Sequence, residues 1–233
     1  PFMSLLEKIL LALVAVLALV GTILSRAAPE YFMNRFVIED GGIEWLTVIA
    51  LVASAVLMLK RAWDLRRERS ALFLFVTGMA ATVFLFGAGE EISWGQRIFS
   101  VETPEWLEAH NKQKEMNLHN LVIGGHSINK LVFSKLLGIV LLLYLLLLPV
   151  LCRKSARWSA RVDRLGIPLP RTWHVLLWIA VLLLSEVAVG TSKRGEIREV
   201  LLTLVLFLQL LRPLNAAIYE RKQICLPGRG DGE

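Results

Sequence analysis

The chain has 233 residues, of which 55% are hydrophobic, and its mean hydropathy is +0.58. This composition excludes soluble enzyme folds, nucleic-acid modules and disordered tails, and it predicts a membrane protein built from spans of about 20 apolar residues each. A formal net charge of +6 would suggest a nucleic-acid partner in a soluble chain. We expect no nucleic acid here, because the positions of the charges give them another meaning.

The apolar runs predict an all-α fold, a bundle of about six transmembrane helices forming one membrane domain over residues 1–233. The expected spans are about 4–24, 42–59, 71–89, 131–151, 172–190 and 197–211. The first run also fits a signal peptide, because the small-x-small triplet Ser25-Arg26-Ala27 follows it. The run is long enough to span a membrane, and we interpret it as an uncleaved first helix.

Basic residues predict the orientation of the bundle. Fourteen of them fall between the second and third spans, between the fourth and fifth, and in the tail: Lys60, Arg61, Arg66, Arg67, Arg69, Arg153, Lys154, Arg157, Arg161, Arg164, Arg171, Arg221, Lys222 and Arg229. Short cytoplasmic loops collect such residues, so we expect both termini in the cytoplasm. Cys152 and Cys225 then lie on the cytoplasmic side, and we interpret them as reduced and unpaired.

The outer segment, residues 90–130, is the longest connection and holds three of the four histidines. Such long loops tend to be functional. If the third helix continues into this segment, Glu90, Ser93 and Arg97 form one stripe beside Trp94. Further along, Thr103 predicts the cap of a helix that starts at the following proline and forms a lid or an interfacial anchor.

Several side chains of the outer segment are candidate ligands of a divalent metal. Glu115 and His119 are four residues apart and would share one helix face, while a bend at Gly124 and Gly125 could bring in His126. Oxygen and imidazole ligands together favour zinc, iron or manganese. The candidate metal ligands are Glu91, Glu115, His119 and His126. The alternative is that each histidine is only a hydrogen-bonding residue at the interface.

The same region supplies the candidate catalytic and binding groups. The candidate catalytic residues are Glu90, Glu91, Ser93 and His119. The candidate substrate-binding residues are Trp94, Gln96, Arg97, Asn117, Asn120 and, from the fifth span, Glu186. A carboxylate within a membrane helix is a functional-site hypothesis, although Glu186 could instead pair with Lys193, Arg194 or Arg97.

The runs Glu90-Glu91-Ile-Ser-Trp-Gly-Gln-Arg97, Glu102-Thr-Pro104 and Asn117-Leu-His119-Asn120 resemble a family of bacterial multi-span inner-membrane proteins. The resemblance covers about thirty residues and implies a bacterial inner-membrane location, but no reaction. The chain is also loosely similar to the alkaline-ceramidase-like membrane hydrolases, in which histidine, acidic and serine side chains hold zinc. Their histidines lie on transmembrane helices in a pattern absent here, so only the chemical logic is shared.

Two functions are compatible with these residues. The first is a lipid-directed hydrolase or transferase, possibly metal-dependent, with its site at the outer membrane face. The second is a transporter, an ion or proton pathway, or a subunit of a membrane complex that uses the same carboxylates. Expected partners are membrane lipid and possibly another membrane protein or a second copy of the chain.

Overall fold

The structure is a computed structural model that describes residues 3–128, 132 and 135–221. Some of the residues used in the sequence analysis lie outside the described residues. They are Lys222, Cys225, Arg229 and parts of the first turns of the expected fourth span.

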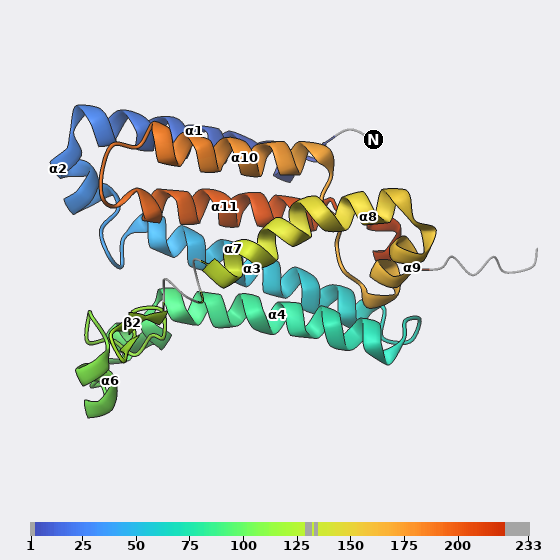
Figure 1. Ribbon diagram of the computed structural model, residues 1–233, viewed down its shortest axis with the longest axis horizontal. Helices are drawn as coiled ribbons and strands as arrows, with labels where there is room; N and C mark the ends of the chain where they lie inside the picture. The colour runs from blue at the N-terminus through green and yellow to red at the C-terminus, as the bar shows by residue number, and fades with distance from the viewer. Residues whose placement is uncertain (1–2, 129–131, 133–134, 222–233) are drawn as a thin grey trace, which may run out of the picture.

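Long helices run lengthwise through the described part of the molecule (Figure 1). They are α1 (Leu5–Ala27), α3 (Gly42–Asp64), α4 (Ala71–Glu91), the continuous series α7 (Leu137–Leu142), η4 (Leu143–Leu147) and α8 (Leu148–Lys154), then α10 (Thr172–Val187) and α11 (Arg194–Leu211). Shorter elements connect them: α2 (Pro29–Tyr31), η1 (Phe32–Phe36), η2 (Ser93–Gly95), α5 (Gln96–Phe99), α6 (Glu105–His110), the antiparallel pair β1 (Val122–Ile123) and β2 (His126–Ser127), α9 (Ala156–Leu165) and η5 (Ala216–Tyr219).

The all-α class is confirmed, and the long apolar helices are consistent with a membrane protein. Among the described residues, four helices are long and apolar enough to cross a membrane: α1, α3, α4 and Leu137–Lys154. Helix α10 is apolar but shorter, with 16 residues. Many large apolar side chains on these helices point outward, and a surface of this kind requires lipid rather than water around it.

The two ends of the bundle differ in their charge. Figure 1 shows α9 and the loop between α3 and α4 at one end, together with the start of α1. The basic stretches 60–69 and 153–171 therefore share an end. The α2 region, α6 and the β1–β2 hairpin lie at the opposite end (Figure 1). We call this the outer end, following the orientation expected from the sequence.

Helix α11 forms the centre of the bundle. It packs against α1, α3 and α10, and it buries an apolar stripe: Ile197, Val200, Leu201, Leu204, Val205 and Leu208. Helix α1 approaches closely because Gly21 faces Ile197, where a Cβ atom would lie 2.9 Å from Ile197 Cγ1. Small residues allow such close contacts between membrane helices.

The helix from Leu137 to Lys154 is attached to the bundle by a polar contact. Pro149 lacks an N–H and crowds the carbonyl four residues earlier, which explains the wider π-helical turn of η4 immediately before it. Within η4, the Tyr144 hydroxyl donates a hydrogen bond to the Pro168 carbonyl oxygen. The Gln209 side chain of α11 donates to the same hydroxyl at 2.6 Å.

Candidate functional site

Helix α4 ends at Glu91, because the next residues leave the helical conformation. Ser93, Trp94 and Gly95 have φ values of 46°, 56° and 75°. Positive φ is uncommon for residues other than glycine and persists only where surrounding contacts enforce it. The expected stripe of Glu90, Ser93 and Arg97 on one continuing helix is therefore wrong.

The turn after α4 is held by Trp94, which folds back over the helix. Its indole Nε1 donates to Glu90 Oε1 at 2.8 Å. The indole ring lies against Gly89, where a Cβ atom would be 2.9 Å from the ring atom Cε3. Only glycine provides the space for this contact. Trp94 therefore shapes the turn, and it remains half exposed at the surface of the outer end.

Glu90 connects α4 to the far part of the outer segment. Its side chain is buried, and Oε2 accepts hydrogen bonds from the backbone N–H groups of Leu118 at 2.6 Å and His119 at 3.0 Å. With the Trp94 indole, three donors surround one carboxylate. Such hydrogen bonds offset the cost of burying a charge. Glu90 is thus the residue that positions the 118–119 backbone at the end of α4.

A second network joins the turn after α4 to Glu115. Ser93 Oγ donates to Glu115 Oε2 at 2.7 Å, and Asn117 Nδ2 donates to both Ser93 Oγ at 2.9 Å and Glu115 Oε2 at 2.8 Å. Arg97 donates to Glu115 Oε1 at 2.7 Å and contacts Asp40 at 2.5 Å. The Ser93 hydroxyl and the Arg97 guanidinium are therefore engaged in holding the loop.

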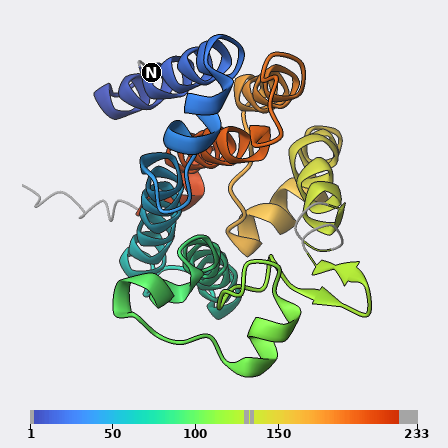
Figure 2. The ribbon, with the colours of Figure 1, turned by 90° about the vertical axis from the view of Figure 1, so that its left-hand side faces the viewer.

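The remaining polar residues of the motif also hold the loop. Gln96 donates to the Thr103 hydroxyl at 2.5 Å and accepts from the Met116 N–H at 2.8 Å. Thr103 donates to the Lys114 carbonyl at 2.6 Å, so it does not cap α6, which starts at Glu105 without a side-chain cap. Asn117 Oδ1 accepts from the Asn120 N–H at 3.3 Å. Figure 2 shows the resulting segment running along the end of α4 toward α7.

His119 lies beside Glu90, with 3.6 Å between Nδ1 and Oε2. Burial alone disfavours the imidazolium, but the close contact with Glu90 and the charges of Glu90, Glu199 and Glu115 outweigh burial and raise the pKa of His119 above its usual 6.5. Residues 111–121 form turns rather than a helix, so the shared helix face expected for Glu115 and His119 does not exist. The contact between His119 and Glu90 replaces it.

Four carboxylates from three helices lie close enough to repel one another, and we call Glu44, Glu91, Glu196 and Glu199 the acidic cluster. Glu91 is repelled by the other three, and Glu196 and Glu199 interact with the positive form of His119. Within the described residues, the carboxylates of Glu91, Glu196 and Glu199 make no hydrogen bond or ion pair shorter than 4 Å. Glu199 is exposed even though it lies on the central helix.

Sequence reasoning missed part of this cluster. Glu44, Glu196 and Glu199 were not among the site residues expected from the sequence. One sequence feature could have indicated two of them. Glu196 and Glu199 are three residues apart at the start of the last apolar run, so they lie on one side of α11. Glu186, which was expected to join the site, instead pairs with Arg194 at 3.3 Å and with Arg198.

The four expected metal ligands do not come together. Glu115 is bound by Arg97, Ser93 and Asn117, whereas His126 is exposed on β2 of the hairpin. Over residues 3–128, 132 and 135–221, no group of three or more histidine, cysteine, aspartate or glutamate side chains is placed to hold a metal ion. Of the four expected ligands, His119 instead contacts Glu90.

The surroundings of Ser93 predict a structural role rather than that of a nucleophile. Ser93 is fully buried, donates to a carboxylate that Arg97 already holds, and is not hydrogen-bonded to His119 in the described structure. We expect Ser93→Ala to lower the free energy of unfolding by about 1–3 kcal/mol, because Asn117 and Glu115 each lose a buried partner. Chemical denaturation of the detergent-solubilised protein measures this. Equal stability of Ser93→Ala and the wild-type protein would contradict the structural role.

No family model, curated protein or solved structure matches this chain.

Proposed function

We propose that the protein is a six-span bacterial inner-membrane protein with both termini in the cytoplasm. The arrangement of the long helices supports this, because successive helices run in opposite directions between the two ends (Figure 1). In this arrangement α10 and α11 complete the set begun by the four helices of sufficient length and hydropathy. The concentration of basic residues at one end supports the orientation.

We further propose that the protein is an enzyme that hydrolyses or transfers the polar headgroup of a membrane lipid at the outer end. One observation carries this proposal: His119 is held by the buried Glu90 on one side and lies near the acidic cluster on the other. A histidine oriented by a fixed carboxylate is a common arrangement for general acid–base catalysis. Its location at the end of membrane helices favours a substrate that resides in the bilayer.

The residues have distinct roles in this proposal. His119 transfers a proton to or from the attacking water or hydroxyl, and Glu90 is a positioning residue that orients the imidazole. Glu91 and Glu199 supply a second acid or base and attract positive charge. Arg97 is already paired with Asp40 and Glu115, so the side chains of the acidic cluster are the open charged groups that interact with His119. They favour a neutral or amine-bearing headgroup over a purely anionic one.

A second candidate function is a proton or cation pathway. It is favoured by the convergence of carboxylates from α3, α4 and α11, since intramembrane carboxylates commonly bind and release protons or cations in transporters. In this function Glu91 and Glu199 are the carriers, and His119 tunes their charge.

One experiment separates the two functions. The protein is reconstituted into vesicles of a bacterial polar lipid extract rich in phosphatidylethanolamine, and lipid products are followed by mass spectrometry while an enclosed dye reports internal pH. The enzyme proposal expects new lipid species that His119→Gln reduces at least 100-fold and that the control Glu186→Gln leaves unchanged. Proton flux that depends on Glu91 and Glu199, without any lipid product, would instead establish the pathway.

A further inference from the structure

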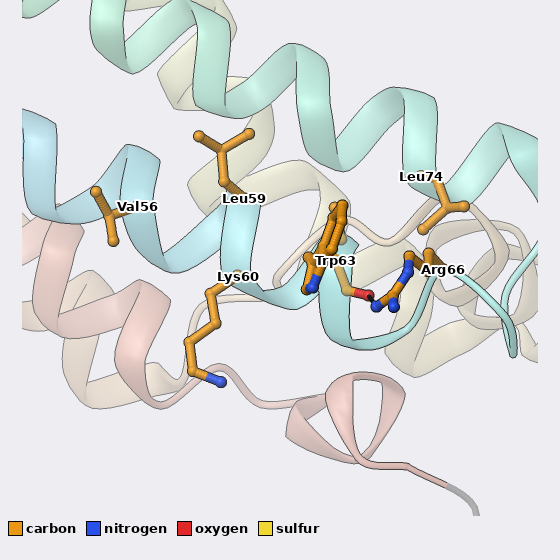
Figure 3. A pocket seen from close by; sticks show the side chains of 7 residues that line it. Val56, Leu59, Lys60, Trp63, Arg66 and Leu74 are labelled. Atoms are coloured by element: carbon orange, nitrogen blue, oxygen red, sulfur yellow. Dashed lines mark hydrogen bonds between the residues drawn. The ribbon is translucent and has the colours of Figure 1, made fainter.

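A second site is a groove at the opposite end of the molecule, between the last turns of α3 and the start of α4 (Figure 3). It is a shallow, open depression of about 580 Å³ with an almost entirely apolar lining. Its apolar wall includes Val56 and Leu59 from α3 and Leu74 from α4. Neither the acidic cluster nor any residue of the outer segment contributes to it.

The apolar wall of the groove faces the surroundings of the bundle rather than its core. Val56 and Leu59 are exposed, while the side of α3 that packs on α4 and α11 is formed by other residues, among them Ala55 and Met58. Both α3 and α4 belong to the helices suited to cross a membrane. The groove is therefore open toward lipid tails, and a hydrocarbon chain is the ligand that matches its wall.

The rim of the groove carries positive charge and an aromatic ring. Trp63 is 66% exposed, which is typical of an indole at the level of lipid headgroups. The Arg66 guanidinium lies 4.1 Å from the Trp63 ring centroid and donates to the Trp63 carbonyl at 2.6 Å. Within the described residues Arg66 makes no ion pair with a carboxylate. Arg66 interacts with the charge of Asp64 only at a distance beyond an ion pair, so its guanidinium can also face an anionic group at the rim.

Lys60 supplies a second cation at the rim. Its ammonium contacts Asp64 at 2.5 Å, but its side chain remains 69% exposed. Asp64 also pairs with Arg221 at 3.4 Å. This single carboxylate therefore does not neutralise both Lys60 and Arg221. The rim as a whole is positive, and Figure 3 shows Lys60 and Arg66 on either side of Trp63.

We propose that this groove binds an anionic phospholipid of the surrounding bilayer. One acyl chain lies along Val56, Leu59 and Leu74, and the phosphate lies at the rim beside Arg66, with Lys60 adding positive charge on the other side of Trp63. Charge complementarity selects an anionic lipid over a zwitterionic one, because basic side chains next to membrane helices attract anionic headgroups. The site is independent of the outer-end chemistry, since its lining residues share no member with that site.

Trp63 is a built-in reporter for this lipid. The full-length protein is placed in bilayers containing brominated phosphatidylglycerol or brominated phosphatidylcholine, since bromine quenches a tryptophan only at close range. The chain has seven tryptophans, so the signal lost in Trp63→Phe isolates Trp63. We expect brominated phosphatidylglycerol to quench Trp63 at lower mole fraction than brominated phosphatidylcholine.

Charge variants complete the test. We expect Arg66→Ala and Lys60→Ala each to weaken the apparent affinity for phosphatidylglycerol about fivefold, whereas the neighbouring Arg67→Ala, with the same change in net charge, leaves it unchanged. Equal quenching of wild-type Trp63 by the two lipids would overturn the proposal, and this comparison needs no variant to fold. Equal effects of Arg66→Ala and Arg67→Ala would also overturn it, as would burial of Trp63 by a second copy of the chain.

Discussion

Replacing Glu90 by glutamine is expected to lower the free energy of unfolding by about 3 kcal/mol. The carboxylate accepts from the Trp94 indole and from the N–H groups of Leu118 and His119. In glutamine, only one of the two side-chain positions is an acceptor oxygen. The amide NH2 group at the other position would face either the Trp94 indole or the N–H groups of Leu118 and His119, which are also donors. Because Glu90 is only 3% exposed, water does not replace the lost acceptor. Chemical denaturation in detergent, compared with wild type, measures the change.

The matched control is Glu105→Gln, which removes the same charge from an exposed position on α6. We expect this variant to stay within about 0.5 kcal/mol of wild type. The Glu90 variant should also free the outer segment, so that amide hydrogens near Leu118 exchange faster. Equal stabilities for the two variants would contradict the role of Glu90 as the anchor of that segment.

His119 is expected to make the stability of the protein depend on pH above about 6.5. Its pKa is raised in the fold, because the close contact with Glu90 and the charges of the surrounding carboxylates outweigh burial. The folded protein therefore binds the proton more tightly than the unfolded chain does. This contribution is fully present below the unfolded value of 6.5 and is lost as pH rises through the higher folded-state pKa. Denaturation midpoints measured from pH 5.5 to 9 follow this loss.

His119→Gln should remove this part of the pH dependence while keeping a hydrogen-bonding side chain near Glu90. The control is His110→Gln, since His110 Nδ1 donates locally to the Trp106 carbonyl at 2.8 Å and the imidazole stacks on the Trp106 ring. His110→Gln should keep the wild-type profile. If His119→Gln kept the wild-type dependence of stability on pH, protonation of His119 beside Glu90 would not stabilise the folded protein.

Much of the architecture follows from the sequence because apolar run length and basic clusters act locally. The runs near residues 42–59 and 71–89 become α3 and α4, and the basic stretch after Leu59 lies at the end of the bundle where the sequence predicted a turn. Hydrophobic length alone determines such helices in a membrane. Helices α3 and α4 continue past these apolar runs to Asp64 and Glu91, because polar residues can also adopt the helical conformation.

The site was less predictable because it depends on contacts between distant parts of the chain. Ser93 and Trp94 adopt positive φ, and their side chains are held by hydrogen bonds to Glu115 and Glu90. The residues next to them in the sequence do not predict this backbone conformation. The polar residues chosen for chemistry, such as Gln96 and Asn117, are largely used to hold one another. Glu199 joins the site only through the packing of α11 on α3, which one sequence does not reveal.

The pKa of His119 tests the central claim most directly, because that claim places one histidine between Glu90 and the acidic cluster. Nuclear magnetic resonance of protein labelled at histidine can follow the four imidazoles through a pH titration, with His119→Gln providing the assignment. We predict that His119 titrates above 6.5 and that Glu199→Gln lowers its pKa, whereas Glu186→Gln, which removes a carboxylate paired with arginines, does not. Titration of His119 at or below 6.5, or a pKa unaffected by Glu199→Gln, would contradict the account.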